Sequence, residues 1–444
     1  MNQVTAEAKS SAALTPDVFM PKIVTVLREG YALDGFRADV IAGLTVAVVA
    51  LPLSMAIAIA SGTTPDRGLY AAIFGGFLVS LLGGSRFQIG GPAGAFIVIV
   101  AAAMARHGIE GVLLATMMAG AMLMMAGLLR IGTYIRYIPY PVTIGFTAGI
   151  AVIIFASQIR DLLGLRLIGN EPGELIAKLD TLARAAPTMN PVAIAISAST
   201  VGIILGFRRI RPTWPGMLIA VVVTGLAVGL LALPVETIGT RFGGIPQNFP
   251  LPSFPEITVA KITAVFPDAI MFALLGAIES LLSAVVADGM TGRQHRSNSE
   301  LVAQGVANIG SALFGGICVT GTIARTATNV RAGARGPIAG MLHSVFLLAF
   351  MLLAAPLASF IPLATLAGVL AVVAWNMAEK HEFAELLRSW ETAVVLLATF
   401  LLTIFTGLAE GIAAGSLLGG LLFLWRKRQG QSAPIKPAST DEFL

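Results

Sequence analysis

Apolar segments of about membrane length follow one another along almost the whole chain. Each segment is bounded by charges, prolines or polar clusters, and we place fourteen of them. They run over 39–61, 68–83, 90–105, 110–129, 139–159, 191–207, 215–233, 268–287, 299–314, 320–334, 337–356, 361–376, 389–406 and 408–425. An α-helix of about 20 apolar residues crosses the hydrocarbon core of a bilayer. We therefore predict an all-α polytopic membrane protein, embedded in a lipid bilayer.

The distribution of charge supports this prediction. Only 12% of the 444 residues are charged and 56% are hydrophobic, whereas soluble domains carry about 25% charged residues. Most of the 29 lysines and arginines fall in segments that are cytoplasmic if the N-terminus is inside. This bias places both termini in the cytoplasm, and we expect a bacterial inner (plasma) membrane. The bias also accounts for the net charge of +5, so we expect no nucleic-acid partner.

Residue types that hold metals or catalyse reactions are sparse in the sequence. The single cysteine, Cys318, excludes an intrachain disulfide and a cysteine-cluster metal site. The four histidines lie far apart, without the HExxH spacing of a zinc site. The sequence offers no paired acid and base and no nucleophile constellation near one leaflet. We therefore expect neither an enzyme nor a bound cofactor or metal.

Short motifs recur between the two halves of the chain. LLGG at 81–84 matches LFGG at 313–316, and ASG at 60–62 matches ADG at 287–289. Each half holds seven segments, so the second copy enters the membrane from the opposite side. This arrangement is the seven-plus-seven inverted repeat of many secondary transporters. The second, third, ninth and tenth segments are short for a full crossing, which predicts broken or half-length helices there.

A glycine-rich stretch leads into a helix at the same place in each half. IGGPAGAFIVIV begins at Ile89, and VTGTIARTATNV begins at Val319. Glycine and Pro92 favour a short extended stretch followed by a helix start. Because the copies are inverted, both helix N-termini approach the bilayer midplane, where their free amides and dipoles favour an anion. Arg325 adds a fixed positive charge, so we predict an anion site in the middle of the membrane.

Several motifs, in order along the chain, resemble those of the SulP (sulfate permease) family of anion transporters. They are DVIAGLTVAVVALPLSMAIAIASGTTPDRGLYAAIFGG from Asp39, GPAGA from Gly91, SLLSAVVADGMTGRQHRSNSELVAQGVANIGSALFGG from Ser280 and TGTIARTATNVRAGARG from Thr320. The resemblance covers about residues 35–425. It implies secondary active transport of a small anion, such as sulfate, bicarbonate or a carboxylate, by an elevator-type mechanism. It also implies a homodimer.

The resemblance further implies a core subdomain that moves against a gate subdomain, with the gate mediating dimer contacts. The core would comprise spans 1–4 at 39–129 and spans 8–11 at 264–356, and the gate spans 5–7 with loops at 130–263 and spans 12–14 at 357–425. We expect cytoplasmic segments at 1–38 and 426–444, without the STAS domain that many relatives carry after the last span.

Matching the family's binding positions residue by residue implies an anion pocket. Its lining would be Leu53, Ile57, Pro92, Ala93, Gly94, Ala324, Arg325 and Thr326. Relatives often have a serine in place of Ala324 and an aromatic residue in place of Ile57 or Ala93. The lining here is smaller and less polar, so the identity of the anion stays open.

Glu279 lies about halfway along the eighth predicted span, where an unpaired charge costs a few kcal/mol or more. The resemblance implies that this position faces the pocket and couples transport to a cation. A carboxylate there could take up H+, or bind Na+ with help from Ser283. We expect H+-coupled symport, because importing an anion against an inside-negative potential requires a compensating cation.

Other interpretations stay open at this point. Na+-coupled symport, anion exchange and a channel-like member of the same family are alternatives. A nucleobase transporter shares this fold, but its NxGxxxxT pattern is missing from the tenth span, where Arg325 suits an anion. Arg325 and Glu279 could also form a purely structural ion pair. His343 in the eleventh span could be a packed polar residue or a proton relay.

Overall fold

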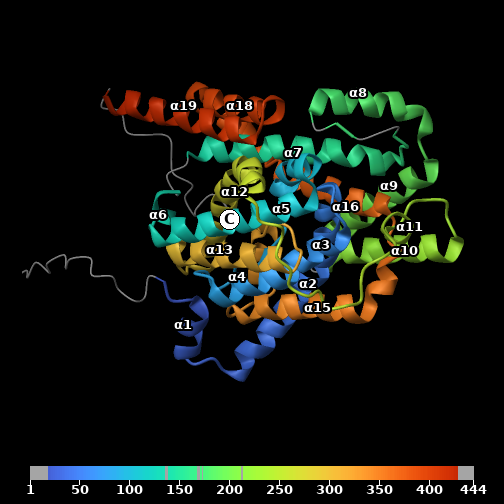
Figure 1. Cartoon of the computed structure of the whole chain (residues 1–444), viewed down its shortest axis with the longest axis horizontal. Helices are drawn as coiled ribbons and strands as arrows, with labels where there is room; N and C mark the ends of the chain where they lie inside the picture. Colours follow the sequence, from blue (N-terminus) through green and yellow to red (C-terminus); the bar gives the residue numbers. More distant parts are fainter. Residues whose placement is uncertain (1–18, 136–138, 168–170, 173, 212–213, 429–444) are drawn as a thin grey trace, which may run out of the picture.

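The chain folds almost entirely into helices, which surround one short pair of strands (Figure 1). The structure is a computed structural model that describes residues 19–135, 139–167, 171–172, 174–211 and 214–428. The outer parts of the terminal segments expected at 1–38 and 426–444 therefore lie outside the described residues.

The helices are α1 (Lys22–Arg28), α2 (Leu33–Ala60), α3 (Pro65–Tyr70), α4 (Gly76–Leu82), α5 (Ile97–Leu128), α6 (Gly132–Ile135), α7 (Tyr140–Leu163), α8 (Leu175–Ala185), α9 (Pro191–Ile210), α10 (Gly216–Leu231), α11 (Ile238–Phe242), α12 (Val259–Thr291), α13 (Ser297–Leu313), α14 (Ile323–Arg331), α15 (Ile338–Ala358), α16 (Leu363–Met377), α17 (Lys380–Leu386), α18 (Trp390–Phe405) and α19 (Leu408–Arg428). The strands are β1 (Gly90–Gly91) and β2 (Thr320–Gly321).

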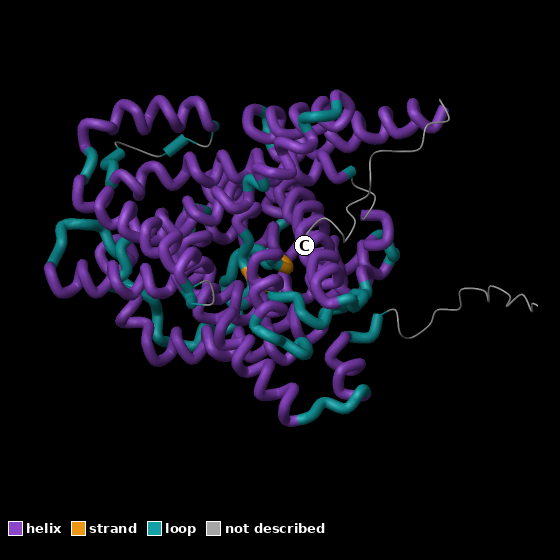
Figure 2. Tube along the Cα trace, turned by 180° about the vertical axis from the view of Figure 1, so that it is seen from behind, coloured by secondary structure: helices purple, strands orange, loops and turns teal. Residues whose placement is uncertain are grey.

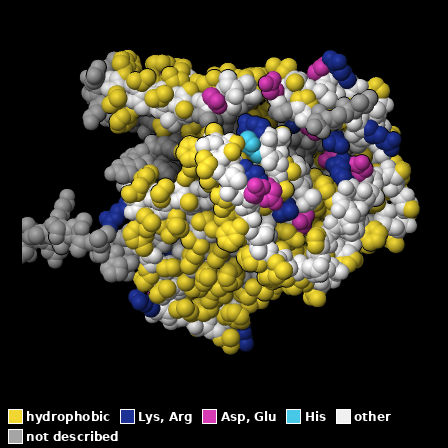
Figure 3. Space-filling model, in the orientation of Figure 1, with side chains coloured by type: hydrophobic (Ala, Val, Ile, Leu, Met, Phe, Trp, Pro, Cys, Tyr) yellow, Lys and Arg dark blue, Asp and Glu magenta, His cyan; other side chains and the backbone are white. Residues whose placement is uncertain are grey.

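Seven of the described helical segments are long and apolar enough to cross a membrane. They are Leu33–Ala60, Gly94–Leu128, Tyr140–Leu163, Pro191–Ile210, Val259–Thr291, Ile338–Ala358 and Leu363–Leu386, and three shorter apolar helices accompany them. Broad hydrophobic areas cover the face of the molecule in Figure 3. Leu230 and Leu353, for example, expose more than four-fifths of their surface. A surface of this kind is stable in lipid, so the chain is an integral membrane protein.

Two predicted segments take a more complex form than a single straight helix. The segment 68–83 is split into α3 and α4 by a π-helical turn at Ala71–Gly75, beside the strands. A Cβ added at Gly76 would lie 2.8 Å from the carbonyl oxygen of Gly90, so the wider turn occurs where two backbones meet. The segments 90–105 and 110–129 both fall in α5, which changes direction at Gly108, where φ is +65°.

The helices pack in two groups. In the first, α5 packs against α12 and α13, and α2 packs against α15. In the second, α7 packs against α16 and α18, and α9 packs against α10 and α16. Figure 2 shows the strand pair near the middle of the molecule, among helices of the first group.

The contact between α5 and α13 depends on small residues. A Cβ added at Gly120 would lie 2.6 Å from the carbonyl oxygen of Gly305, and a Cβ added at Gly305 would lie 2.5 Å from that of Gly120. Glycine at both positions therefore allows the two backbones to touch, which is how membrane helices gain packing energy without a hydrophobic driving force.

A buried carboxylate on α13 holds the connection between α4 and β1. Glu300 is fully buried and accepts hydrogen bonds from the amides of Gly84 at 2.9 Å and Ser85 at 3.1 Å. It also accepts hydrogen bonds from Nε2 of Gln88 at 3.0 Å and Nε2 of Gln304 at 2.9 Å. Glu300 thus fixes the chain immediately before the first strand.

We expect Glu300→Ala to destabilise the protein strongly. It leaves four buried donors without this acceptor, and each unsatisfied buried donor costs about 1–3 kcal/mol. Thermal unfolding of the detergent-solubilised protein, followed by size-exclusion chromatography, should show a lower midpoint for Glu300→Ala, with Glu300→Gln in between. Glu256→Ala removes an exposed carboxylate and serves as the control. Equal midpoints for Glu300→Ala and Glu256→Ala would contradict the structural role of Glu300.

Candidate functional site

The two glycine-rich stretches pair with each other as antiparallel strands. Gly90 lies opposite Gly321, and Gly91 lies opposite Thr320. The amide of Thr322 continues the pairing with a 3.0 Å hydrogen bond to the carbonyl oxygen of Ile89. Extended backbone at membrane depth is tolerated only where its polar groups are satisfied by protein or face water. The extended stretches expected ahead of these two helices are present, and the backbone groups of each form hydrogen bonds with those of the other.

A helix begins directly after each strand, and neither N-terminus is capped by a side chain. A 3₁₀ turn at Gly94–Phe96 leads from β1 into α5, and α14 follows β2. Several first-turn amides donate no hydrogen bond within the part of the chain that the structure describes: those of Gly94, Ala95, Ile323, Ala324 and Arg325. Free amides at helix N-termini carry partial positive charge and bind anions.

Arg325 lies against the strand pair without a counter-ion. It is 1% exposed, and its Nη2 donates a 3.2 Å hydrogen bond to the carbonyl oxygen of Pro92. Its Nε and Nη1 atoms are buried and have no partner among the described residues. A Cβ added at Gly91 would lie 2.2 Å from Nη1, so the guanidinium fits only because residue 91 is glycine. An unpaired buried guanidinium favours a negative charge nearby.

Glu279 on α12 is a buried acid, as Arg325 is a buried base. Its side chain is 7% exposed, and it forms no hydrogen bond or ion pair with any described residue. In particular, Arg325 and Glu279 do not form the ion pair considered above as a purely structural role. One turn before Glu279, the carbonyl oxygen of Gly276 accepts a 3.2 Å hydrogen bond from Thr320 Oγ1. One turn after it, Ser283 Oγ donates a 3.0 Å hydrogen bond to Thr326 Oγ1, so α12 is fixed to β2 and α14 on both sides of Glu279.

The other predicted pocket residues gather around the same place. Leu53 and Ile57 on α2 are buried in one hydrophobic cluster with Ala93. Ala324 is exposed at the start of α14, and Gly94 is half-buried. A Cβ added at Gly94 would lie 3.4 Å from both Ile154 Cδ1 on α7 and Met377 Sδ on α16. The first helix turn after β1 therefore lies at the boundary between the two groups of helices.

Sequence reasoning missed the polar side chains that hold the strands. Asn308 on α13 donates to the carbonyl oxygen of Val319 at 2.8 Å and accepts from the amide of Val319 at 2.9 Å. Asn329 on α14 donates to the carbonyl oxygen of Phe87 at 2.9 Å. A usable signal existed, because Glu300, Gln304 and Asn308 recur every four residues and so share one face of an otherwise apolar helix.

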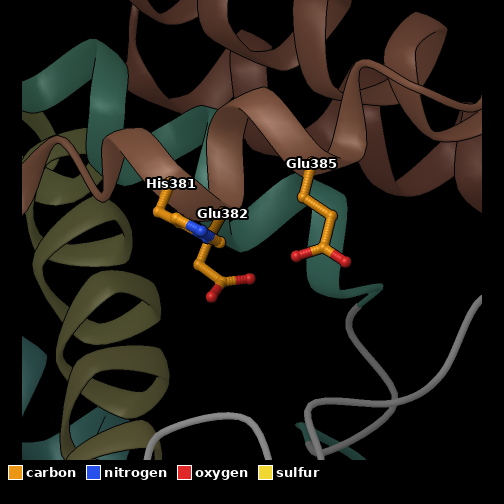
Figure 4. Close-up of side chains that lie close together, drawn as sticks. All are labelled: His381, Glu382 and Glu385. Carbon is orange, nitrogen blue, oxygen red and sulfur yellow. The ribbon is translucent and has the colours of Figure 1, made fainter.

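A second group of acids lies at the connection between α16 and α17 and along α17 itself. Glu379 lies close enough to Glu279 for the two carboxylates to repel each other. Figure 4 shows the side chains of His381, Glu382 and Glu385 on the same side of α17. Their possible ligand atoms all lie within 4.8 Å of one another. These three could hold a metal ion, but two are exposed and Glu382 already accepts a 3.1 Å hydrogen bond from Tyr140.

Comparison with known proteins identifies the family. The sequence model of the Sulfate permease family matches residues 36–413. The chain belongs to this family. The resemblance drawn from the sequence motifs is therefore confirmed, and the chain is a member of a family of transporters, not of enzymes.

Individual relatives of this Sulfate permease family member are also named as anion transporters. YvdB of Bacillus subtilis, which its name assigns provisionally to sulfate transport, is 45% identical over 94% of this chain and 78% of its own length. The bicarbonate transporter BicA of Picosynechococcus is 32% identical over 91% of this chain and 73% of its own length. These two relatives are named for different anions.

Solved structures show the same fold. The transmembrane domain of a cyanobacterial bicarbonate transporter BicA superposes with a TM-score of 0.76 at 31% identity, covering 87% of this chain and 98% of that one. Murine Solute Carrier 26 family member A9, an anion transporter in an inward-facing state, superposes with a TM-score of 0.83 over 95% of this chain and 74% of its own. At 18% identity, the second likeness speaks for the fold alone.

We expect Gly91→Ala to destabilise the strand pair and displace Arg325, because the new methyl group would overlap Nη1 and overpacking costs about 1–3 kcal/mol. The measurement is the thermal unfolding midpoint of the purified protein. Gly202→Ala on α9, where an added Cβ meets nothing within 4 Å, is the matched control. If both variants unfold at the same temperature, the close approach of Arg325 to β1 is wrong.

Proposed function

We propose that this protein is a secondary active transporter of a small anion of the sulfate, bicarbonate or carboxylate class. One observation carries the proposal: two uncapped helix N-termini are joined through paired strands, with an unpaired buried arginine beside them. The amides and the guanidinium supply donors and positive charge for an oxyanion. The names of the relatives, which include sulfate and bicarbonate transporters, support the same class.

The anion would bind between the first turns of the helices after β1 and β2. The proposed lining is Leu53, Ile57, Pro92, Ala93, Gly94, Ala324, Arg325 and Thr326. The exposed Ala324 and the half-buried Gly94 would face the anion directly. Arg325, held behind the strands, would act through its charge and would orient Pro92.

Transport would follow an elevator-type alternating-access mechanism on fourteen spans arranged as a seven-plus-seven inverted repeat. A core of residues 39–129 and 264–356 would move against a gate of 130–263 and 357–425. The two groups of packed helices support this division, because α2, α5, α12, α13 and α15 fall in the first group and α7, α9, α10, α16 and α18 in the second. The proposed site lies at their boundary, where such a movement would alternately open it to either side.

Coupling to H+ at Glu279 would supply the driving force. Moving one negative charge inward against 100 mV costs about 2.3 kcal/mol, and a co-transported cation offsets that cost. A buried carboxylate without a partner is stabilised by protonation or by a bound cation. Na+ is the second candidate, favoured by the neighbouring oxygens of Ser283 and Thr326, because hard cations prefer oxygen ligands.

The protein would lie in a bacterial inner (plasma) membrane as a homodimer, with both termini in the cytoplasm. The charge bias between the predicted loops supports the orientation. Exposed apolar side chains on α18 and α19, such as Leu401, Leu417 and Leu421, support a dimer contact through the gate.

We expect Arg325→Ala to reduce anion uptake by about tenfold or more, since loss of a charge-assisted contact of about 1.4 kcal/mol corresponds to that factor. The measurement is uptake of labelled sulfate, bicarbonate and fumarate into proteoliposomes. Arg325→Lys, which keeps the charge, should retain part of the activity, and the exposed Arg37→Gln should match wild type. Wild-type rates in Arg325→Ala would overturn the proposed site.

We expect Glu279→Gln to remove the dependence of uptake on a cation gradient. In the same proteoliposomes, wild type should accumulate its anion only with an inward H+ gradient, or only with an inward Na+ gradient if Na+ is the coupling ion. Glu279→Gln should equilibrate the anion without accumulating it, because an amide neither takes up a proton at neutral pH nor carries charge for Na+. Accumulation driven equally well in Glu279→Gln and wild type would exclude Glu279 from coupling.

A further inference from the structure

A cavity of about 520 Å³ lies far from the strand pair, where the ends of several helices come together. The last residues of α7, the first residues of α9 and α16, and the connection between α10 and α11 form its walls. In Figure 1 these helix ends meet on the right-hand side. None of the residues proposed above for the central anion site lines this cavity.

Two arginines in the cavity wall lack partners. The side chains of Arg160 and Arg166 form no hydrogen bond or ion pair with described residues, and the Nε atom of Arg160 is fully buried without an acceptor. The two acids of the wall are already occupied, because Arg241 pairs with Asp161 at 2.9 Å and also with Glu236. Together these three arginines outnumber the two acids by one, so the net charge at the cavity is positive.

Two helix N-termini open into the same cavity. Ala193 in the first turn of α9 and Ala364 in the first turn of α16 both line it. Their amides donate no hydrogen bond to any residue that the structure describes. The neighbouring amides are capped, that of Val192 by Asn190 Oδ1 at 2.9 Å and that of Leu363 by the carbonyl oxygen of Glu236 at 2.9 Å. The uncapped amides and the two arginines point to an anionic ligand.

The remaining wall is apolar, and the cavity is large. Leu165, Leu167, Leu233 and Val235 line it beside the charged groups. A volume of this size is typical of pockets for organic ligands, so a small inorganic anion would leave much of it empty. Nearby, α8 packs against α7 and exposes Ile176 and Leu179, as a helix at a membrane surface does.

We propose that this cavity binds an amphipathic anion through its oxyanion group, a phosphate or a carboxylate. Arg160 and Arg166 hold the charge, the amides of Ala193 and Ala364 donate to the oxygens, and the leucine-lined wall contacts the apolar body. Such a group is offered by an anionic lipid at the membrane surface or by a free anion. The cavity is separate from the central site and does not depend on the proposed transport function.

The test is native mass spectrometry of the whole delipidated chain in neutral detergent, titrated with phosphatidylglycerol or phosphatidylcholine. Wild type should bind phosphatidylglycerol at least about fivefold more tightly, since charge-assisted hydrogen bonds supply such factors. Arg160→Gln combined with Arg166→Gln should abolish the preference. Arg184→Gln, which removes an exposed arginine of α8 paired with Asp180, should keep it.

Two further arms decide the source and guard against misfolding. Binding of a free anion is detected by the rise in unfolding temperature on titration with inorganic phosphate or a medium-chain fatty acid in lipid-free micelles. If this rise requires both arginines and the protein shows no preference for phosphatidylglycerol, the site binds free anions. Arg160→Lys should bind more tightly than Arg160→Gln and more weakly than wild type, because lysine keeps the charge but lacks the forked donors of arginine. If no probe depends on Arg160 and Arg166, the proposal is wrong. Arg325→Ala should leave binding to this cavity unchanged. The test therefore remains valid even if the proposal for the central anion site is wrong.

Discussion

The satisfaction of backbone hydrogen bonds inside the membrane is the constraint on which this structure depends. Residues 90–91 and 320–321 are extended and buried among helices that are long and apolar enough to cross a membrane, where unpaired amides would cost several kcal/mol each. The two stretches pair with each other, so each provides hydrogen-bond partners for the backbone of the other. The pairing also brings the starts of α5 and α14 together. The first-turn amides that donate no hydrogen bond therefore lie close to one another. A site rich in donors thus follows from the solution to a folding problem.

The two buried ionisable residues near the strands, Arg325 and Glu279, do not form an ion pair with each other. Arg325 has two nitrogen atoms without partners, and Glu279 has no partner among the described residues. A fold selected only for stability would pair such charges or replace them with apolar groups. In the proposed mechanism, this separation would leave Arg325 available to stabilise an anion and Glu279 available to accept a cation. The occupancy of one proposed site would then change the binding free energy at the other, which coupled transport requires.

Much of this arrangement could be predicted from the sequence, because its signals are local. Apolar segment length predicted the helices, and glycine with Pro92 predicted the extended entries to α5 and α14. The register of β1 on β2 could not be predicted, since it joins residues more than 200 positions apart through contacts that no local pattern encodes. The orientation of Arg325 was equally hidden, because it depends on the space left by Gly91. The roles of Asn308 and Asn329 depend on which carbonyl groups the fold brings beside them.

In the proposed elevator mechanism, the position of Gly94 would link the anion site to the movement of the helices. A Cβ added at Gly94 would lie 3.4 Å from side-chain atoms of Ile154 on α7 and Met377 on α16, and the helix that Gly94 leads into belongs to the other group of helices. A larger side chain at residue 94 would press into both neighbours, and interlocked side chains resist sliding because packed interfaces deform in discrete steps. In the proposed mechanism, a bare backbone at the boundary would offer its amide to an anion and would leave a smooth surface for one group of helices to pass the other. The smallest residue in the proposed lining would therefore serve both binding and translocation, with its backbone amide adding a donor beside the charge of Arg325.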